Sequence, residues 1–469
     1  MTETARARHL AAAGAPLDRA LDRACAARAI PGNDVTHLAD GPRTMEAILA
    51  LIDGARDTVH FENYIIRSDG AGERAADALI AAARRGATVR VLYDALGCRW
   101  TRRAYWRRLT TGGVAVRRFH PINPFRPIRT LRRDHRKYVA ADGRRAIVGG
   151  MCIGDEWVGR PDDGGEAWRD TAVEVCGPAV TALDLTFLRR WTQTGADGTE
   201  TTVSTPAEAC GAAQVRVIDG IPGRLRLVRA VELLAASAAE RLWLTDAYLI
   251  PPISLYATLI SAARDGVDVR ILVPGRTDLP VVRALTRAGY RELLAAGVRI
   301  WEWHGPMLHA KTVLVDDRWF KVGSSNLNPS SLISNYEIDL LVDDVPTADA
   351  AARQFRRDLA DAVEIVLRPR QAPRRLADRL PPAVVPETRG RPPRRASRDL
   401  PERAVLQVRQ VAGGARRSIA GTILFALVGW GVLLLTLPRI MAYFLAAVAF
   451  LLAGGGAWHV FVRWRHRDR

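Results

Sequence analysis

The strongest constraint on the fold is a pattern that the chain contains twice. Residues 135–142 and 309–316 both read H-x-K-x-x-x-x-D, and the second copy follows the first at an offset of 174 residues (309 − 135 = 174). The marked residues are His135, Lys137 and Asp142 in the first copy and His309, Lys311 and Asp316 in the second. A glycine-containing pair follows each copy at the same offset, at 149–150 and 323–324. Equivalent chemistry in two copies predicts a duplicated structural unit.

The sequence around each copy predicts a β-hairpin. Residues 138–141 and 312–315 favour strands, and residues 146–148 and 319–322, which follow a short polar turn, favour the returning strands. A histidine and a lysine two positions apart point to the same face of a strand. The motif aspartates, Asp142 and Asp316, fall at the turns. They are candidates for a catalytic role, although a turn residue that accepts local hydrogen bonds is the simpler interpretation.

Arginine carries almost all of the positive charge in this chain. Among its 68 lysine and arginine residues only three are lysines, namely Lys137, Lys311 and Lys321. Two of the three occupy the equivalent motif positions, which indicates a need for a compact ammonium group beside a phosphate oxygen. Two histidines with two such lysines favour phosphoryl transfer, in which one imidazole attacks phosphorus and the other protonates the leaving oxygen. Lysine is not a usual metal ligand, so no metal ion and no cofactor is expected.

The paired motifs and their surroundings resemble the phospholipase D superfamily and, within it, the bacterial cardiolipin synthases. The supporting stretches are 62–65, 149–156, 168–170, 247–251 and 323–327, and the resemblance covers roughly residues 31–368. It implies that His135 is the nucleophile and His309 the general acid and base. It also implies that Lys137, Lys311, Asn326 and Ser324 bind the substrate phosphate, and that Asp170 and Glu337 orient the histidines, as an acid does in a catalytic triad. Asp170 follows His135 and Glu337 follows His309, which suggests one carboxylate for each half.

The chain departs from the family pattern at one position. The constant offset places Cys152 opposite Asn326, where the family usually has a second asparagine. A thiol is a weak hydrogen-bond donor, so phosphate binding in the first half is expected to be weaker or to come from a neighbouring group.

Helix and strand patterns alternate through both halves. Helices are predicted at 44–56 and 71–85 with strands at 59–66 and 88–93, and the order repeats as helix 225–239, strand 242–250, helix 255–264 and strand 268–273. The predicted fold class is therefore α/β: two duplicated phospholipase D-like α/β/α halves, residues 31–200 and 201–367, related by a pseudo-twofold axis with a shared cleft. Residues 1–30 are predicted to form a helical N-terminal extension.

The C-terminal hundred residues change in character. Residues 368–415 are rich in Pro and Arg and predict a linker. Residues 416–469 predict a transmembrane helical hairpin, because 419–437 and 440–462 are uncharged stretches long enough to cross a bilayer. Arginines flank its outer ends, so the positive-inside rule places the catalytic halves on the cytoplasmic side of the cell inner membrane. The five cysteines form no C-x-x-C pair and are odd in number, which favours a reducing compartment.

The formal net charge of +18 predicts an anionic partner. The leading hypothesis is a membrane-bound phosphatidyltransferase that makes cardiolipin and glycerol from two molecules of phosphatidylglycerol, or from one and another phosphatidyl donor, through a phosphohistidine. The alternatives are a phospholipase D that hydrolyses lipid to phosphatidic acid and a phosphodiester nuclease that uses the basic surface. The predicted membrane hairpin argues against nucleic acid as a partner. The sequence makes no prediction about the oligomeric state.

Overall fold

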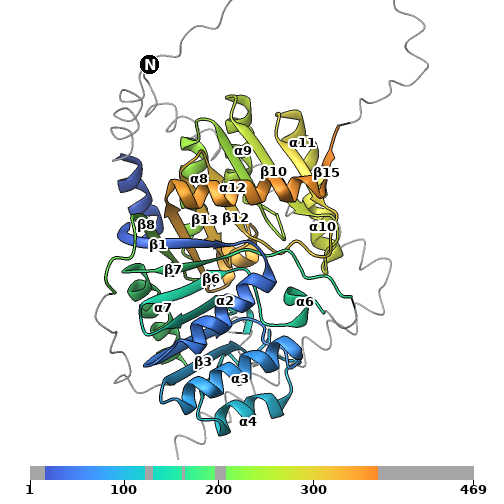
Figure 1. The fold of residues 1–469 in the computed structure, drawn as a ribbon. Coiled ribbons are helices and arrows are strands. Elements are labelled where there is room, and N and C mark those ends of the chain that lie inside the picture. Colours follow the sequence, from blue (N-terminus) through green and yellow to red (C-terminus); the bar gives the residue numbers. More distant parts are fainter. Residues whose placement is uncertain (1–15, 122–129, 161–163, 196–206, 368–469) are drawn as a thin grey trace, which may run out of the picture. The chain divides into compact units, whose positions relative to one another are not determined.

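The structure is a computed structural model that describes residues 16–121, 130–160, 164–195 and 207–367 (Figure 1). These residues belong to one compact unit. The predicted linker, the predicted transmembrane hairpin and the first 15 residues of the predicted N-terminal extension lie outside the described residues. Within the described ranges, no helix combines the length and the apolar character that a membrane span requires.

The first half contains the following elements after a helix at residues 16–25. They are β1 (Ile30–Leu38), α2 (Gly41–Asp53), β2 (Thr58–Asn63), α3 (Gly70–Arg84), β3 (Thr88–Asp94), α4 (Arg103–Thr111), β4 (Ala115–Phe119), β5 (Lys137–Ala141), β6 (Arg145–Gly149), α6 (Asp155–Val158), β7 (Ala172–Cys176) and α7 (Ala179–Gln193). The predicted helices at 44–56 and 71–85 correspond to α2 and α3, which begin earlier because Asp40 and Asp69 cap them by accepting hydrogen bonds from Arg43 N and Gly72 N.

The second half repeats this order of elements. They are β8 (Ala213–Gly220), α8 (Arg226–Ser237), β9 (Arg241–Thr245), α9 (Ile253–Arg264), β10 (Asp268–Pro274), α10 (Pro280–Ala288), α11 (Tyr290–Ala295), β11 (Arg299–Trp303), β12 (Thr312–Val315), β13 (Trp319–Gly323), the π-helical turn η2 (Ser330–Ser334), β14 (Glu337–Asp343), α12 (Val345–Ala360) and β15 (Ala362–Ile365). Strands β2 and β9 end before the predicted limits of 66 and 250. The residues that follow them include Tyr64 and Tyr248, which line a cavity between the halves.

The strand order shows the relation between the halves. The described strands form one sheet in the order β15-β11-β10-β9-β12-β13-β14-β8-β1-β7-β6-β5-β2-β3-β4. Read outward from the central β8 and β1, which pair antiparallel, the two sides carry equivalent strands in the same order. In each half three strands run parallel, β2-β3-β4 and β9-β10-β11, and the motif hairpin lies between them and the centre. The mixed α/β fold with two similar halves is thus confirmed.

A shared core holds the halves together. One cluster of buried residues combines Val173, Val175 and Phe187 of the first half with Phe320 and Leu340 of the second. Separate clusters lie under α2 and α3 in the first half and under α8 and α9 in the second. The central cluster removes apolar surface from water only when both halves are present, so the halves stabilise one another.

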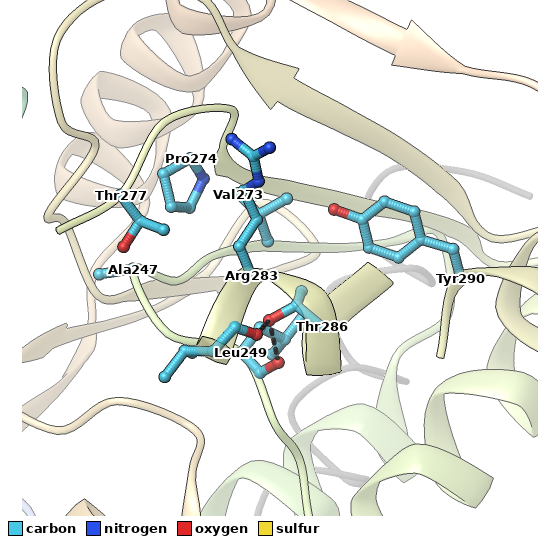
Figure 2. Close-up of a pocket in the computed structure, with 9 residues that line it drawn as sticks. Ala247, Leu249, Val273, Pro274, Thr277, Arg283, Thr286 and Tyr290 are labelled. Carbon is cyan, nitrogen blue, oxygen red and sulfur yellow. Dashed lines mark hydrogen bonds between the residues drawn. The ribbon is translucent and has the colours of Figure 1, made fainter. Parts of the chain in front are cut away.

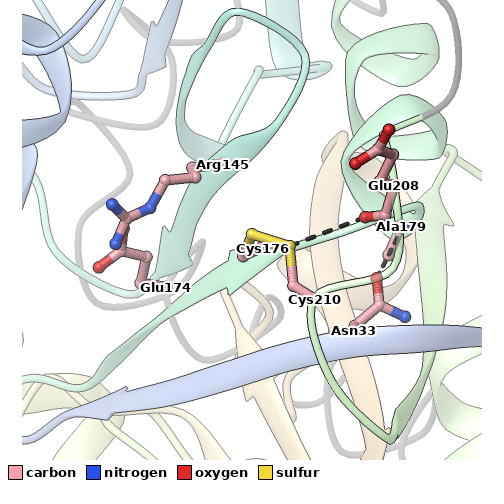
Figure 3. Close-up of a disulfide and its surroundings, with 7 residues drawn as sticks. All are labelled: Asn33, Arg145, Glu174, Cys176, Ala179, Glu208 and Cys210. Atoms are coloured by element: carbon pink, nitrogen blue, oxygen red, sulfur yellow. Dashed lines mark hydrogen bonds and ion pairs between the residues drawn. A yellow bond between two sulfur atoms is a disulfide. The ribbon is translucent and has the colours of Figure 1, made fainter.

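The cysteines differ from the sequence prediction. Cys176, the last residue of β7, forms a disulfide with Cys210, which lies shortly before β8 (Figure 3). The bond joins the end of the first half to the start of the second, where Cys210 N also donates to Gly32 O (2.8 Å). Neither the odd count nor the spacing of 34 residues signals this pair. Disulfides persist in oxidising compartments, so the expectation of a reducing compartment did not anticipate this pairing.

Candidate active site

The two motif histidines lie where the halves meet. His135 comes just before β5, and its backbone N–H donates to Tyr336 O of the second half (2.9 Å). His309 comes just before β12, and its backbone N–H donates to Arg169 O of the first half (2.7 Å). Each motif is therefore attached at its first residue to the opposite half, as the pseudo-twofold relation requires.

The orienting carboxylates are exchanged between the halves. Glu337, the first residue of β14, accepts a hydrogen bond from His135 Nδ1 at 3.0 Å. Asp170, which precedes β7, accepts one from His309 Nδ1 at 2.7 Å. The sequence assigned Asp170 to His135 and Glu337 to His309, and this pairing is wrong. With Nδ1–H donated to a carboxylate, Nε2 is the ring nitrogen that remains for chemistry in each histidine.

Both histidines line a single cavity of about 580 Å³. Small-molecule sites commonly enclose ~300–1,000 Å³, so the cavity is large enough for a phosphodiester headgroup. Tyr64 and Trp100 come from the first half, and Tyr248, Leu279 and Asn326 from the second. The shared cleft of the sequence prediction is thus present between the halves.

The two motif lysines lie behind the histidines. Lys137 Nζ donates to His135 O (2.6 Å) and lies 5.2 Å from the centre of the Tyr64 ring. Lys311 Nζ donates to His309 O. Burial, helped by the charge of Lys137, lowers the pKa of Lys311 to about 8. Two buried ammonium groups, each bonded to the backbone carbonyl of its motif histidine, provide positive charge of the kind that an anionic phosphodiester needs.

Burial also sets the protonation of the histidines and their carboxylates. Desolvation lowers the pKa of His309 to about 4, with Lys311 acting in the same direction and Asp170 against it. Desolvation likewise lowers the pKa of His135. Burial alone would raise the pKa of Asp170, but the neighbouring His309 and Lys311 outweigh it and hold that pKa below its usual value, and His135 does the same for the pKa of Glu337. In the free protein both imidazoles are therefore neutral at pH 7 and both carboxylates are ionised.

Aromatic rings surround the histidines. The ring of Tyr64 meets that of His135 edge-on, with the centroids 4.8 Å apart, and Tyr248 meets His309 in the same manner at 6.1 Å. Trp157 and Trp168 pack against His309 with centroids at 5.7 and 5.8 Å. These rings limit the orientations of the imidazoles and reduce access of water. The sequence prediction gave these rings no role in the site. The equivalent positions of Tyr64 and Tyr248 in the two halves could have indicated that both tyrosines lie beside the motif histidines.

The motif aspartates lie at the far ends of the hairpins. Asp142 adopts a left-handed conformation (φ 53°), and its carboxylate accepts hydrogen bonds from Asp57 N (2.8 Å) and Thr58 N (2.9 Å) at the start of β2. Asp316 (φ 52°) does the same with Glu240 N (2.8 Å) and Arg241 N (3.0 Å) at the start of β9. Strand β5 has five residues, which span about 16 Å, so Asp142 lies far from the reacting nitrogen. The geometry favours the simpler interpretation, in which both aspartates fix the hairpin.

Of the side chains predicted to bind phosphate, Asn326 lines the cavity and Ser324 does not. Asn326 and its counterpart Cys152 both line the cavity, and Asn326 Oδ1 has no hydrogen-bond partner in the described part of the chain. Ser324 lies deeper, because its hydroxyl donates to Glu337 Oε2 (2.5 Å) and accepts from Ile338 N (2.9 Å). The structure therefore gives Ser324 the task of holding Glu337, which differs from the predicted phosphate contact.

The glycines after each motif occupy positions where a side chain would clash with its neighbours. A Cβ at Gly150 would lie 2.2 Å from Asp170 Oδ1, and a Cβ at Gly323 would lie 2.4 Å from Asp339 Oδ1. Asp339 in turn pairs with Lys321 Nζ (2.8 Å), the third lysine, and bonds to Ser325. This buried pair, which the sequence did not reveal as part of the site, fixes the loop that carries Asn326.

Comparison with known proteins agrees with this geometry. Residues 48–158 and 232–359 match the family described as "Cardiolipin synthase, PLD-like domain". The chain is 33% identical over 335 residues to cardiolipin synthase 2 of Bacillus anthracis, a match that covers 70% of this chain and 65% of that protein. It is 34% identical over 339 residues to cardiolipin synthase A of Pseudomonas entomophila, covering 72% of this chain and 70% of the relative. The chain thus spans about two thirds of the length of these relatives.

A solved structure shows the same fold. The phosphatidylserine synthase of Haemophilus influenzae superposes with a TM-score of 0.57 at 14% identity, covering 74% of this chain and 92% of that one. At that identity the likeness concerns the fold alone. The sequence matches, taken with the paired motifs around one cavity, show that the chain belongs to the cardiolipin synthase family with phospholipase D-like domains.

Proposed function

We propose that this protein is a phosphatidyltransferase that converts two molecules of phosphatidylglycerol into cardiolipin and glycerol. With another phosphatidyl donor, one phosphatidylglycerol would give cardiolipin and the headgroup alcohol of that donor. One observation carries the proposal: two histidines, each held by a carboxylate of the opposite half, line one cavity with two lysines behind them. This arrangement provides a nucleophile, an acid and charge stabilisation around a single phosphorus atom.

In the first step His135 Nε2 attacks the phosphorus of the donor lipid. A nitrogen–phosphorus bond forms, the bond from phosphorus to the headgroup glycerol oxygen breaks, and His309 donates a proton to that oxygen as glycerol leaves. The low pKa of His309 in the free protein must rise for this step, and the negative charge of the bound phosphodiester acts in that direction. Glu337 stabilises the positive charge that develops on His135.

In the second step the headgroup hydroxyl of another phosphatidylglycerol replaces glycerol. His309 removes the proton of that hydroxyl, the oxygen attacks phosphorus, and the bond to His135 breaks to release cardiolipin. Water in place of the lipid alcohol would give phosphatidic acid, which is the hydrolase alternative. The aromatic rings around both histidines oppose water entry and thereby favour transfer.

We further propose that the chain is a multi-pass protein of the cell inner membrane, through the spans predicted at 419–437 and 440–462. The flanking arginines favour a cytoplasmic position for the catalytic halves. The disulfide between Cys176 and Cys210 weighs against that side, because the cytoplasm keeps thiols reduced. The number of free thiols in the protein distinguishes a cytoplasmic position of the catalytic halves from a position in an oxidising compartment.

Product analysis tests the proposal. Full-length protein is incubated with phosphatidylglycerol in mixed micelles, and cardiolipin, glycerol and phosphatidic acid are measured together, with and without a chelator. Cardiolipin with an equal amount of glycerol is the expected result, unchanged by the chelator. Phosphatidic acid alone would make the protein a hydrolase, and activity that a divalent ion restores after chelation would contradict the metal-free mechanism. His135→Ala and His309→Ala are the inactive controls.

A further inference from the structure

Several large apolar side chains are exposed on and just before helix α10 of the second half. Helix α10 has no buried residue, and Val281 and Leu285 on it are 73% and 55% exposed. Leu279, just before the helix, is 47% exposed, and Trp100 of the first half is 71% exposed. We call these four residues the apolar rim. Soluble surfaces seldom gather large apolar side chains without a binding purpose, so the rim needs a partner.

The rim lies at the mouth of the catalytic cavity. Trp100 and Leu279 line the cavity and are at the same time largely exposed, which places them where the cavity meets solvent. Trp100 follows strand β3 and Leu279 follows strand β10, and these are equivalent strands of the two halves. The rim therefore borders the cavity from both sides of the pseudo-twofold axis.

Hydrogen bonds attach the inner side of α10 to the neighbouring segments of the protein. Thr286 donates to Leu249 O (2.8 Å), and the guanidinium of Arg283 donates to Gly275 O (2.8 Å). Figure 2 shows Arg283 and Thr286 beside the segments that follow β9 and β10, around a small cavity that Tyr290 also lines. These bonds hold the helix on the body of the protein with Val281 and Leu285 turned outward.

The charges beside the rim are mostly positive. Exposed arginines flank Trp100 and the α10 segment, and they are Arg99, Arg102, Arg103, Arg276 and Arg287. Arg287 pairs with Glu302, and Asp278, which accepts a hydrogen bond from Tyr248, is an acidic group among the other four arginines. Apolar side chains beside several arginines match the headgroup region of an anionic bilayer, where tryptophan is also favoured. A second copy of the chain, itself at +18, would meet electrostatic repulsion.

We propose that the apolar rim inserts into the surface of an anionic phospholipid bilayer, so that a lipid headgroup enters the catalytic cavity directly from the membrane. The identity of that lipid rests on the proposed function. The contact with the bilayer does not, because it depends only on the exposed side chains and the charges around them.

A fluorescent probe tests the contact with the bilayer. Cys25, Cys98 and Cys152 are buried, so once Cys176 and Cys210 are replaced by serine, a new surface cysteine can be labelled selectively in the folded full-length protein. Val281→Cys is labelled with the fluorophore NBD and reconstituted in vesicles of phosphatidylglycerol and phosphatidylcholine. Val345→Cys is the matched control, because Val345 is 56% exposed at the start of α12, away from the cavity lining. Blue-shifted emission and quenching by spin-labelled lipid are expected at position 281 alone, and equal emission at both positions would overturn the proposal.

An activity measurement tests the delivery of substrate. Val281→Ser/Leu285→Ser is expected to lower turnover of long-chain phosphatidylglycerol in vesicles by about tenfold or more, while turnover of dissolved dihexanoyl phosphatidylglycerol stays within about twofold of the unmodified protein. Val345→Ser/Val363→Ser, at two other exposed valines, is expected to change neither. An equal loss on both substrates, or no loss on vesicles, would overturn the proposal. If the unmodified protein turns over neither lipid, the proposed function fails while the probe measurement still decides the membrane contact.

Discussion

Replacing the carboxylate that holds His309 tests the assignment of the acid. Asp170→Asn keeps the shape of the side chain and removes its charge, at a position where the carboxylate lies 2.7 Å from His309 Nδ1 and both side chains are almost fully buried. The imidazolium then loses its counter-charge, so the pKa of His309 falls below its value of about 4. An amide also fails to impose the tautomer that leaves Nε2 for catalysis.

The expected loss follows from these two effects. General acid–base catalysis contributes roughly 10²–10⁴-fold, and an amide in place of the acid of a catalytic triad removes on the order of 10⁴-fold, so kcat should fall by about 10³-fold or more, equal to ~4 kcal/mol or more. KM should change little, because the substitution leaves both motif lysines in place. Thermal unfolding of the variant should be measured beside its activity, since Asp170 also accepts a hydrogen bond from Thr171 N (2.8 Å).

A substrate whose leaving group needs no proton shows which of the two chemical steps each variant impairs. With dihexanoylphosphatidyl-p-nitrophenol, Asp170→Asn should release a rapid burst of p-nitrophenol and then proceed slowly, because only the first step is relieved. Glu337→Gln, the matched change at His135, should show no burst, because the nucleophile itself is impaired. A burst in Glu337→Gln and none in Asp170→Asn would exchange the roles of the two histidines. Full activity in both variants would refute the reasoning.

Three further predictions concern single groups. Cys152→Asn adds the amide that Asn326 supplies in the other half, so KM for phosphatidylglycerol should fall by a few-fold in steady-state assays, and a rise would contradict a phosphate contact there. The pKa of Lys311 is lowered to about 8, so kcat/KM should fall as the pH rises through 8. Lys311→Arg should be less active, and its residual activity should lack this decline, because the guanidinium does not lose its proton in this range. Alkylation of denatured protein taken directly from cells with a maleimide polymer should modify three cysteines if Cys176 and Cys210 are paired, and five if the catalytic halves lie in a reducing compartment.

The pH dependence of stability also has a definite sign. The pKa of His309 is lowered from 6.5 to about 4, and that of His135 is lowered as well. At these histidines the unfolded chain binds more protons than the folded chain between these values. The contribution of His309 to the free energy of unfolding should therefore decrease as the pH falls from 6.5 towards 4. Burial raises the pKa values of Asp94 and Asp246 to about 6, which acts in the opposite direction, so chemical denaturation should compare the protein with His309→Gln over this range. A stability difference between these two proteins that does not change with pH would contradict the burial of a neutral imidazole at His309.

The sequence predicted the repeated elements well because each depends on local signals. The hairpins of both motifs and the helix–strand alternation follow from residue periodicity and turn chemistry, and the structure places them within a few residues of the predicted limits. The constant offset of 174 identified four residues that line the cavity, namely His135, His309, Cys152 and Asn326. The catalytic role of these residues stays a prediction until the variants are measured.

The remaining features depend on contacts between distant segments. The pairing of His135 with Glu337 spans 202 residues, and a repeat offset gives no information about which half supplies each partner. Ser324 was assigned to phosphate because a hydroxyl beside the motif resembles a ligand, while its burial against Glu337 appears only in three dimensions. The disulfide escaped prediction because five cysteines allow many pairings and none has a distinctive spacing.

The exchange of carboxylates makes the chemistry depend on completed synthesis. A nascent chain that has produced only the first half contains His135 without Glu337 and Asp170 without His309. No activated imidazole can form until the last strands of the second half emerge and join the central core. Fragments released by premature termination or proteolysis between the halves would carry intact motifs and yet be inert. Under the proposed function, the fold therefore keeps an incomplete chain from acting on lipid.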